Sequence, residues 1–250
     1  MPGENLTRIE AAERAEILKV ESYDVNLDLT SGEQTFRSKT KVTFTAKAGA
    51  STFIDAITAK VHRVVLNGVE LDPTVVSDGH RIELPGLQAQ NQLEVDADAF
   101  YMKTGEGLHR FVDPVDNEVY LYTQFEVPDS RRMFAVFEQP DLKATFTFTI
   151  KAPSYWSVVS NQPTPKPTEL GDGNSVWAFP PTPRLSSYVT ALIAGPYVSR
   201  HSTLTSADGR TIPLGVYARA SMEQYLEADY MFEKTREGFE FFEKTFSYPY

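Results

Sequence analysis

The sequence contains no cysteine, which excludes disulfide bonds, thiolate nucleophiles and cysteine-ligated metal sites. Histidine is also scarce, and no two of the four lie three to five residues apart: His62, His80, His109 and His201. The H-E-x-x-H pattern of a helical zinc site is therefore absent. No G-x-S-x-G motif supports a serine nucleophile. Each histidine is better explained as a structural residue, and the chain taken alone has no recognisable catalytic group set.

Basic residues are outnumbered: 24 Lys and Arg stand against 34 Asp and Glu, a net charge of −10. Such a chain is a poor partner for nucleic-acid phosphates or an anionic membrane surface, and we expect neither. No run approaches the ~18 apolar residues of a membrane helix, and the N-terminal stretch lacks the apolar segment of a signal peptide. The absence of cysteine fits a reducing compartment. We therefore expect a cytoplasmic protein.

Apolar and polar side chains alternate with a period of two over much of the chain, as in strands with one wet face. The residues 23–29 and 36–44 show this clearly, and further short runs follow at intervals of 8–12 residues as far as residue 193. Asn67-Gly68 is a strong two-residue hairpin signal, and Asp78-Gly79 between Val75-Val76 and Ile82-Leu84 is a second candidate turn. The pattern predicts a mostly β fold, an antiparallel sandwich or barrel and not a parallel sheet.

Two helices are predicted, each from a capping box. Thr7 with Glu10 begins a short helix over residues 7–18, and Ser221 with Gln224 begins a longer one over residues 221–246. The longer helix carries an aromatic stripe at intervals of seven: Tyr225, Phe232, Phe239 and Phe246. A stripe of this width needs a partner surface. Because no later segment of the sequence supplies one, we expect the chain to be the start of something longer.

Gln124 and Glu126 are the most informative polar pair. At i and i+2 in an extended chain, both side chains leave the same face. An amide oxygen beside a carboxylate offers acceptors to a primary ammonium group, which donates three hydrogen bonds. The alternative is a solvated strand face on which Glu126 pairs with Arg131 or Arg132. Spacing alone favours that alternative.

The surrounding segment resembles the N-domain signature of the M1 family of zinc aminopeptidases, the aminopeptidase N type. That signature reads T-Q-x-E, A-R-R, D-E-P and K-A-x-F. The matching residues are Thr123-Gln124, Glu126, Arg131-Arg132, Pro140 and Lys143-Ala144 with Phe146. Agreement extends to Tyr23–Leu29, Gly107-Leu108, Val159–Asn161, Leu192–Tyr197 and Pro213–Ala218. The opening helix and acidic first strand look most like actinobacterial members.

The resemblance implies that residues 1–200 form the saddle-shaped β-sandwich N-terminal domain of such an enzyme. Residues 201–250 would then be the truncated beginning of an α/β, thermolysin-like catalytic domain. It also implies a zinc-activated water that attacks the first peptide bond of peptides with a free N-terminal amine. The zinc ligands and catalytic base would lie downstream, so this chain would hold no zinc, no metal ligand and no catalytic residue. Carried over by position, Gln124 would line the S1 pocket and Glu126 would bind the α-amine.

Three departures from the family pattern are expected to affect local packing. They are Glu138-Gln139 in place of Asp-Glu, Ala135-Val136 in place of Phe-Pro-Cys, and Val127-Pro128. Two other functions stay open: a non-catalytic scaffold of the same superfamily, and a free-standing β-sandwich binding module. Gln124 and Glu126 argue against the scaffold, and the unpartnered helix over residues 221–246 argues against the module.

Overall fold

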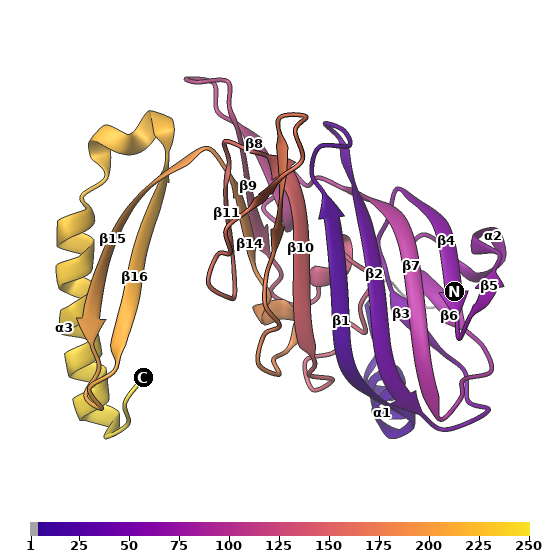
Figure 1. The fold of residues 1–250 in the computed structure, drawn as a ribbon. Helices are drawn as coiled ribbons and strands as arrows, with labels where there is room; N and C mark the ends of the chain where they lie inside the picture. Colours follow the sequence, from indigo (N-terminus) through magenta and orange to yellow (C-terminus); the bar gives the residue numbers. More distant parts are fainter. Residues whose placement is uncertain (1–4) are drawn as a thin grey trace. The chain divides into compact units, whose positions relative to one another are not determined.

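The computed structural model describes residues 5–250, which form two compact units (Figure 1). The first comprises the described residues up to Phe111 together with Leu121–Gly195, and the second comprises Val112–Tyr120 and Pro196–Tyr250. Sheets dominate, and most strand pairs are antiparallel, so the predicted mostly β fold is confirmed. No helix among the described residues is long and apolar enough to cross a membrane.

The largest sheet has eight strands in the order β12-β13-β10-β1-β2-β7-β4-β5. Their bounds are β1 (Leu18–Asp28), β2 (Thr35–Ala46), β4 (Lys60–Leu66), β5 (Val69–Leu71), β7 (Gln90–Phe100), β10 (Thr145–Pro153), β12 (Thr168–Glu169) and β13 (Asn174–Ala178). One pair departs from the expected antiparallel arrangement, since β1 runs parallel to β10. Alternation within a strand cannot reveal this, because it reports which face is wet and not the direction of the neighbour.

A four-stranded sheet has the order β11-β14-β9-β8, and a two-stranded sheet pairs β3 with β6. Their bounds are β3 (Thr52–Asp55), β6 (Arg81–Leu84), β8 (Gly107–Val112), β9 (Val119–Gln124), β11 (Ser157–Ser160) and β14 (Leu192–Gly195). Short helices complete this part of the chain: α1 (Arg8–Ile17), α2 (Pro73–Val76), η1 (Ser130–Arg132) and η2 (Ser187–Val189).

The predicted start of α1 is confirmed: the Thr7 hydroxyl accepts from the Glu10 amide, and the Glu10 carboxylate accepts from the Thr7 amide. The Asn67-Gly68 hairpin is also confirmed, with both residues at positive φ between β4 and β5. Val75-Val76, the apolar pair before the candidate turn at Asp78-Gly79, does not form a strand of a hairpin. Asp72 caps the short helix α2 there, and Pro73 occupies its first turn, where a missing N–H costs nothing.

An aromatic cluster forms the centre of the first unit. The Tyr23 ring of β1 stacks on the Phe146 ring of β10, with centroids 4.8 Å apart. The Phe134 ring meets Tyr23, Phe146 and Phe148 edge-on, at 6.3, 6.1 and 5.9 Å. All four side chains are buried. Phe134 lies two residues beyond η1, so the cluster fixes the segment that follows β9.

The second unit contains the hairpin of β15 (Tyr197–Thr205) and β16 (Thr211–Arg219), followed by η3 (Ala220–Tyr225) and α3 (Ala228–Phe246). The predicted helix start at Ser221 is wrong, because α3 begins seven residues later. Ser221 instead lies within η3, and its hydroxyl donates to Asp113 Oδ2 at 2.6 Å. Arg219 donates to the same oxygen at 2.6 Å.

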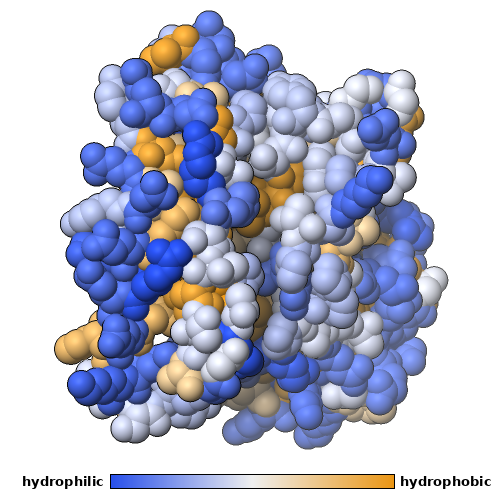
Figure 2. All heavy atoms as spheres, turned by 60° about the vertical axis from the view of Figure 1, so that its left-hand side comes forward, coloured by the Kyte–Doolittle hydropathy of each residue, from blue (hydrophilic) through white to orange (hydrophobic). Residues whose placement is uncertain are grey.

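The predicted aromatic stripe is only partly covered within the second unit. Phe232 is buried and Phe239 is half-buried, whereas Phe246 is 70% exposed. Hydrophobic residues reach the surface among hydrophilic ones in the view that brings the α3 side forward (Figure 2). The end of α3 and the residues after it line an apolar pocket of about 520 Å³, which includes Phe242, Phe246 and Tyr250.

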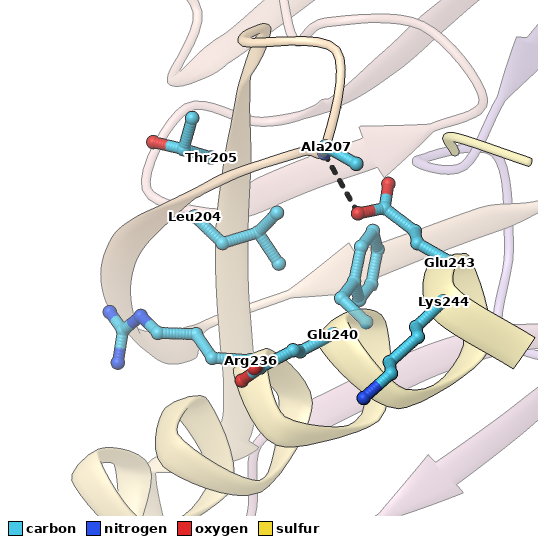
Figure 3. Close-up of a pocket in the computed structure, with 8 residues that line it drawn as sticks. Leu204, Thr205, Ala207, Arg236, Glu240, Glu243 and Lys244 are labelled. Carbon is cyan, nitrogen blue, oxygen red and sulfur yellow. Dashed lines mark hydrogen bonds between the residues drawn. The ribbon is translucent and has the colours of Figure 1, made fainter. Parts of the chain in front are cut away.

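A second pocket of about 470 Å³ lies between β15 and α3 (Figure 3). Two of its charged side chains, Glu243 and Arg236, are engaged with neighbouring groups. The Glu243 carboxylate accepts from the Ala207 amide at 2.8 Å and from the Ser206 hydroxyl at 2.5 Å, and Arg236 donates to the Thr203 carbonyl. The hydrogen bond from Ser206 is the main reason that the pKa of Glu243 is lowered. These contacts join the hairpin to the helix.

Candidate functional site

The site begins where β9 ends. The Thr123 hydroxyl accepts from the Leu192 amide at 2.8 Å, which ties the end of β9 to β14. Gln124 is the last residue of β9, and its side chain is exposed. Phe125 then buries its ring edge-on against Phe134, with centroids 6.4 Å apart. Gln124 therefore lies at the surface, next to the buried residue Phe125.

Glu126 lies in a turn over residues 126–129 and not in the strand. Gln124 and Glu126 therefore do not share one strand face as predicted, because β9 stops at Gln124. The turn is closed by a hydrogen bond of 3.4 Å from the Asp129 amide to the Phe125 carbonyl. Both candidate residues remain within three positions of each other, one at the strand end and one in the turn.

The Glu126 carboxylate is exposed and makes no hydrogen bond or ion pair within residues 5–250. The alternative in which it pairs with Arg131 or Arg132 is thus absent from this structure. Arg132 pairs instead with Asp129, Nε to Oδ1, at 2.7 Å. An acceptor held on a packed turn without a partner of its own can receive an external ammonium group.

A buried carboxylate lies behind this turn. Glu138 is 3% exposed, and its Oε2 accepts from the Ser130 hydroxyl and, at 2.8 Å, from the Arg131 amide. Its Oε1 accepts from the Ser187 hydroxyl of η2 at 2.5 Å. Burial raises the pKa of Glu138, while these hydrogen bonds act in the opposite direction.

In the sequence, Glu138 stands out only as a departure from the family pattern, and Ser130 and Ser187 were not predicted to be part of the site. The signal available in the sequence was weak. Ser130 precedes Arg131 within the signature itself, but nothing local indicates that Ser187, 49 positions beyond Glu138, is its partner. Of the other two departures, Ala135 and Val136 are buried and Val136 bridges to Asp55, whereas Val127 is exposed in the turn.

The side chains of the described residues do not assemble a metal site. No cluster of three or more His, Asp or Glu side chains that could hold a metal ion occurs among residues 5–250. His109, the histidine nearest to this region, receives a hydrogen bond from the Gly105 amide at 3.0 Å and lies against Tyr122. The donor set present here does not fit zinc.

Comparison with known proteins identifies the family. Residues 19–189 match the family model described as the peptidase M1 N-terminal domain. The whole chain is 56% identical to an aminopeptidase N of Streptomyces lividans, of which it covers 29%. A shorter stretch, 42% of the chain, is 41% identical to an aminopeptidase N of Acetobacter pasteurianus.

The fold agrees with that assignment. A crystal structure of Legionella pneumophila aminopeptidase A in complex with aspartic acid superposes on 92% of this chain with a TM-score of 0.80 at 19% identity, and 27% of that chain is covered. The present chain thus spans less than a third of the length of the Streptomyces and Legionella proteins. Because of the family match and the identity over its whole length, the chain belongs to the peptidase M1 family and contains an N-terminal domain of the aminopeptidase N type.

Proposed function

We propose that this chain is the N-terminal portion of a zinc metallo-aminopeptidase that removes single N-terminal residues from peptides. The observation that carries the proposal is the 56% identity to an aminopeptidase N along all of this chain. In that longer protein, zinc and the residues that bind it would belong to the downstream segment. The described residues would contribute no metal ligand, and we assign them no step at the metal.

The domain division follows from the same proposal: residues 1–200 form the N-terminal domain and residues 201–250 the beginning of the catalytic domain. The exposed end of α3 supports it, because Phe242 and Phe246 are 56% and 70% exposed. Apolar area of this kind is normally covered. The downstream catalytic segment is the intramolecular partner that would cover it. A cytoplasmic location stays a prediction, which cell fractionation tests.

Within the enzyme, Glu126 would bind the α-ammonium group of the substrate, and Gln124 would line the S1 pocket. A peptidase that removes one residue must hold the N-terminal amine at a fixed distance from the catalytic centre, so that only the first peptide bond is cleaved. An exposed carboxylate without a partner, on a turn packed through Phe125, is suited to that task. Pairing with the terminal NH₃⁺ would orient the first peptide bond, and such positioning is worth more in a closed site than in water.

The test is Glu126→Gln in the full-length protein. The two side chains are nearly isosteric, so we expect the fold to persist. For substrates with a free amine, the transition-state stabilisation measured by kcat/KM should fall by about 2–4 kcal/mol. This is the range for removal of one partner of a buried charge pair. Binding of an inhibitor without an amine should change far less. The control is Glu169→Gln, which removes the same charge from the exposed strand β12.

Equal losses for ligands with and without the amine, together with a lower Tm, would assign Glu126 a structural role. A full-length protein that hydrolyses no aminoacyl substrate would instead favour the non-catalytic scaffold.

A further inference from the structure

Glu138 connects three segments that are remote from each other in the chain. Through Oε2 it holds both Ser130 and Arg131, the first two residues of η1, and through Oε1 it holds Ser187 of η2. Its own amide donates to Asp55 Oδ2 of β3 at 3.0 Å. Glu138, Ser130 and Ser187 are each no more than 3% exposed. The carboxylate therefore sits at a dry junction behind the turn over residues 126–129.

The turn over residues 126–129 is held at both of its ends. It is closed on itself by the Asp129 amide and the Phe125 carbonyl, and Phe125 anchors its first end in the core. Its second end runs directly into Ser130, where the Glu138 contacts begin. Asp129 pairs with Arg132 at 2.7 Å, which links the turn to η1, and the Arg131 carbonyl accepts from the Ile57 amide at 2.9 Å. Loss of the Glu138 contacts would leave η1 with these fewer attachments, and would therefore loosen the position of Glu126 without removing any atom of Glu126.

We propose that Glu138 is a positioning residue for the substrate amine: its buried carboxylate holds η1 so that the turn presents Glu126 at one fixed place. This inference rests on the proposed function, because it takes Glu126 as the amine-binding residue. Glu138 itself is buried behind the turn and touches no substrate. Its effect would be exerted entirely through the Ser130 and Arg131 contacts.

Two variants distinguish the role of the Glu138 hydrogen bonds from the role of its charge. Glu138→Ala removes all three contacts. Glu138→Gln keeps the length of the side chain: its oxygen can accept from Ser130 and Arg131, and its NH₂ group can donate to the Ser187 hydroxyl oxygen. The matched control is Asn91→Ala, because Asn91 is also buried and makes three side-chain hydrogen bonds, to Asn67 and Gln88, at the start of β7.

The first measurement is amide hydrogen exchange in the 250-residue chain. Glu138→Ala should speed exchange in peptides spanning residues 125–132 by about tenfold or more, since a local opening loses its restraint. Glu138→Gln should remain close to the unchanged chain. Asn91→Ala should speed exchange around residues 88–92 and leave residues 125–132 unaffected. Unchanged exchange over residues 125–132 in Glu138→Ala would overturn the proposal.

The second measurement is made in the full-length protein, as the ratio of kcat/KM for a free-amine substrate to affinity for an amine-free inhibitor. We expect Glu138→Ala to lower this ratio about tenfold, Glu138→Gln to restore it, and Asn91→Ala to leave it unchanged. The ratio should fall no further when Glu138→Ala is added to Glu126→Gln, because both act through one contact.

The two proposals fail differently. If Glu126→Gln lowers the ratio and Glu138→Ala does not, Glu126 binds the amine but Glu138 does not position it. If Glu126→Gln leaves the ratio unchanged, the role of Glu126 is wrong and the positioning role falls with it. A ratio that falls equally in Asn91→Ala would show a general effect of lost stability and would also overturn the inference.

Discussion

At the scale of single residues, α1 contributes one partner of a buried ion pair. Arg14 Nη1 lies 2.8 Å from Asp55 Oδ2, and both side chains are 1% exposed. Arg14 also donates through Nε to Gln139 at 3.1 Å, and its guanidinium lies 4.9 Å from the centroid of the Phe53 ring. A buried polar contact thus attaches α1 to the rest of the first unit.

Arg14→Leu should destabilise the chain by about 3–5 kcal/mol, because it leaves the Asp55 carboxylate buried without its cation. The measure is the free energy of unfolding in urea. Arg63→Leu is the control: Arg63 is half exposed and faces Glu70 at 3.5 Å, so its loss should cost about 0–1 kcal/mol. Similar costs for the two variants would contradict the importance of burial.

Glu10 gives α1 a dependence on pH. Mainly because Arg81 donates to its carboxylate at 2.6 Å, the pKa of Glu10 is lowered from 4.5 to about 2. A carboxyl with a depressed pKa in the folded state stabilises the fold above its unfolded pKa, and this stabilisation is lost as the pH falls. The loss should occur between pH 4.5 and about 2.

Glu10→Gln should therefore flatten the fall in unfolding free energy across that acid range. The exposed Glu13 of the same helix supplies the comparison, since Glu13→Gln makes the same change in charge. If both variants lose stability with acid as steeply as the unchanged chain, Glu10 does not carry this linkage.

At the scale of elements, β8 approaches η1 closely at Gly107. Gly107 has φ +59°, and a Cβ built there would lie 2.9 Å from Cβ of Arg132 and 3.1 Å from Cγ of Met102. Gly105 also has positive φ, at +89°, but its Cβ would meet nothing within 4 Å. The two glycines therefore differ in crowding and share the conformation that disfavours side chains.

Gly105→Ala should cost about 1–2 kcal/mol, the penalty of the left-handed conformation alone. Gly107→Ala should cost clearly more, since it adds the clash with Arg132. Thermal unfolding of the two variants measures the difference. Equal shifts in Tm would show that β8 moves away from η1 without penalty.

Elements with a local cause were predictable from the sequence. The Thr7 capping box and the Asn67-Gly68 hairpin were found because all the interacting groups lie within a few residues. The start of α3 was missed because residues 220–225 form the separate helix η3, in which the Ser221 hydroxyl bonds to Asp113, 108 positions earlier. The parallel pairing of β1 with β10 was missed for the same reason. Contacts between residues far apart in the sequence cannot be predicted from a short stretch of it.

In the candidate site, too, features with a local cause were predictable and those that depend on distant residues were not. Gln124 and Glu126 were identified because the signature around them is contiguous. The end of β9 at Gln124 was not predicted, since Phe125 continues the apolar alternation while its ring turns into the core against Phe134. The Glu138 junction was not predicted either, because its partners lie 7, 8 and 49 positions away.

At the scale of the whole molecule, the described residues contain no cluster of metal ligands, and this predicts that the chain binds no zinc. A zinc site needs three or four well-placed donors, and none is assembled among residues 5–250. We expect no stoichiometric zinc in a tag-free sample of the 250-residue chain by metal analysis, and no hydrolysis of aminoacyl substrates. Tight one-to-one zinc would contradict both expectations. The full-length protein, prepared in parallel, is the positive control.

The exposed end of α3 should govern the association state of the 250-residue chain. The rings of Phe242 and Phe246 stack with centroids 6.0 Å apart on the surface, beside an apolar pocket of about 520 Å³. Contiguous exposed apolar area of this kind drives self-association. We expect light scattering to report a mass that rises with protein concentration.

Replacing both rings, as Phe242→Glu with Phe246→Glu, should make the chain monodisperse, because charge on that surface opposes contact between copies. Tyr230→Glu is the matched control: Tyr230 lies in the first turn of α3, is 58% exposed and is remote from the pocket in sequence. It should leave the association unchanged. A chain ending near residue 200 should likewise be more monomeric than the 250-residue chain. If the unchanged chain is already as monodisperse as these variants, the surface at the end of α3 needs no partner, and the argument that a downstream segment covers it fails.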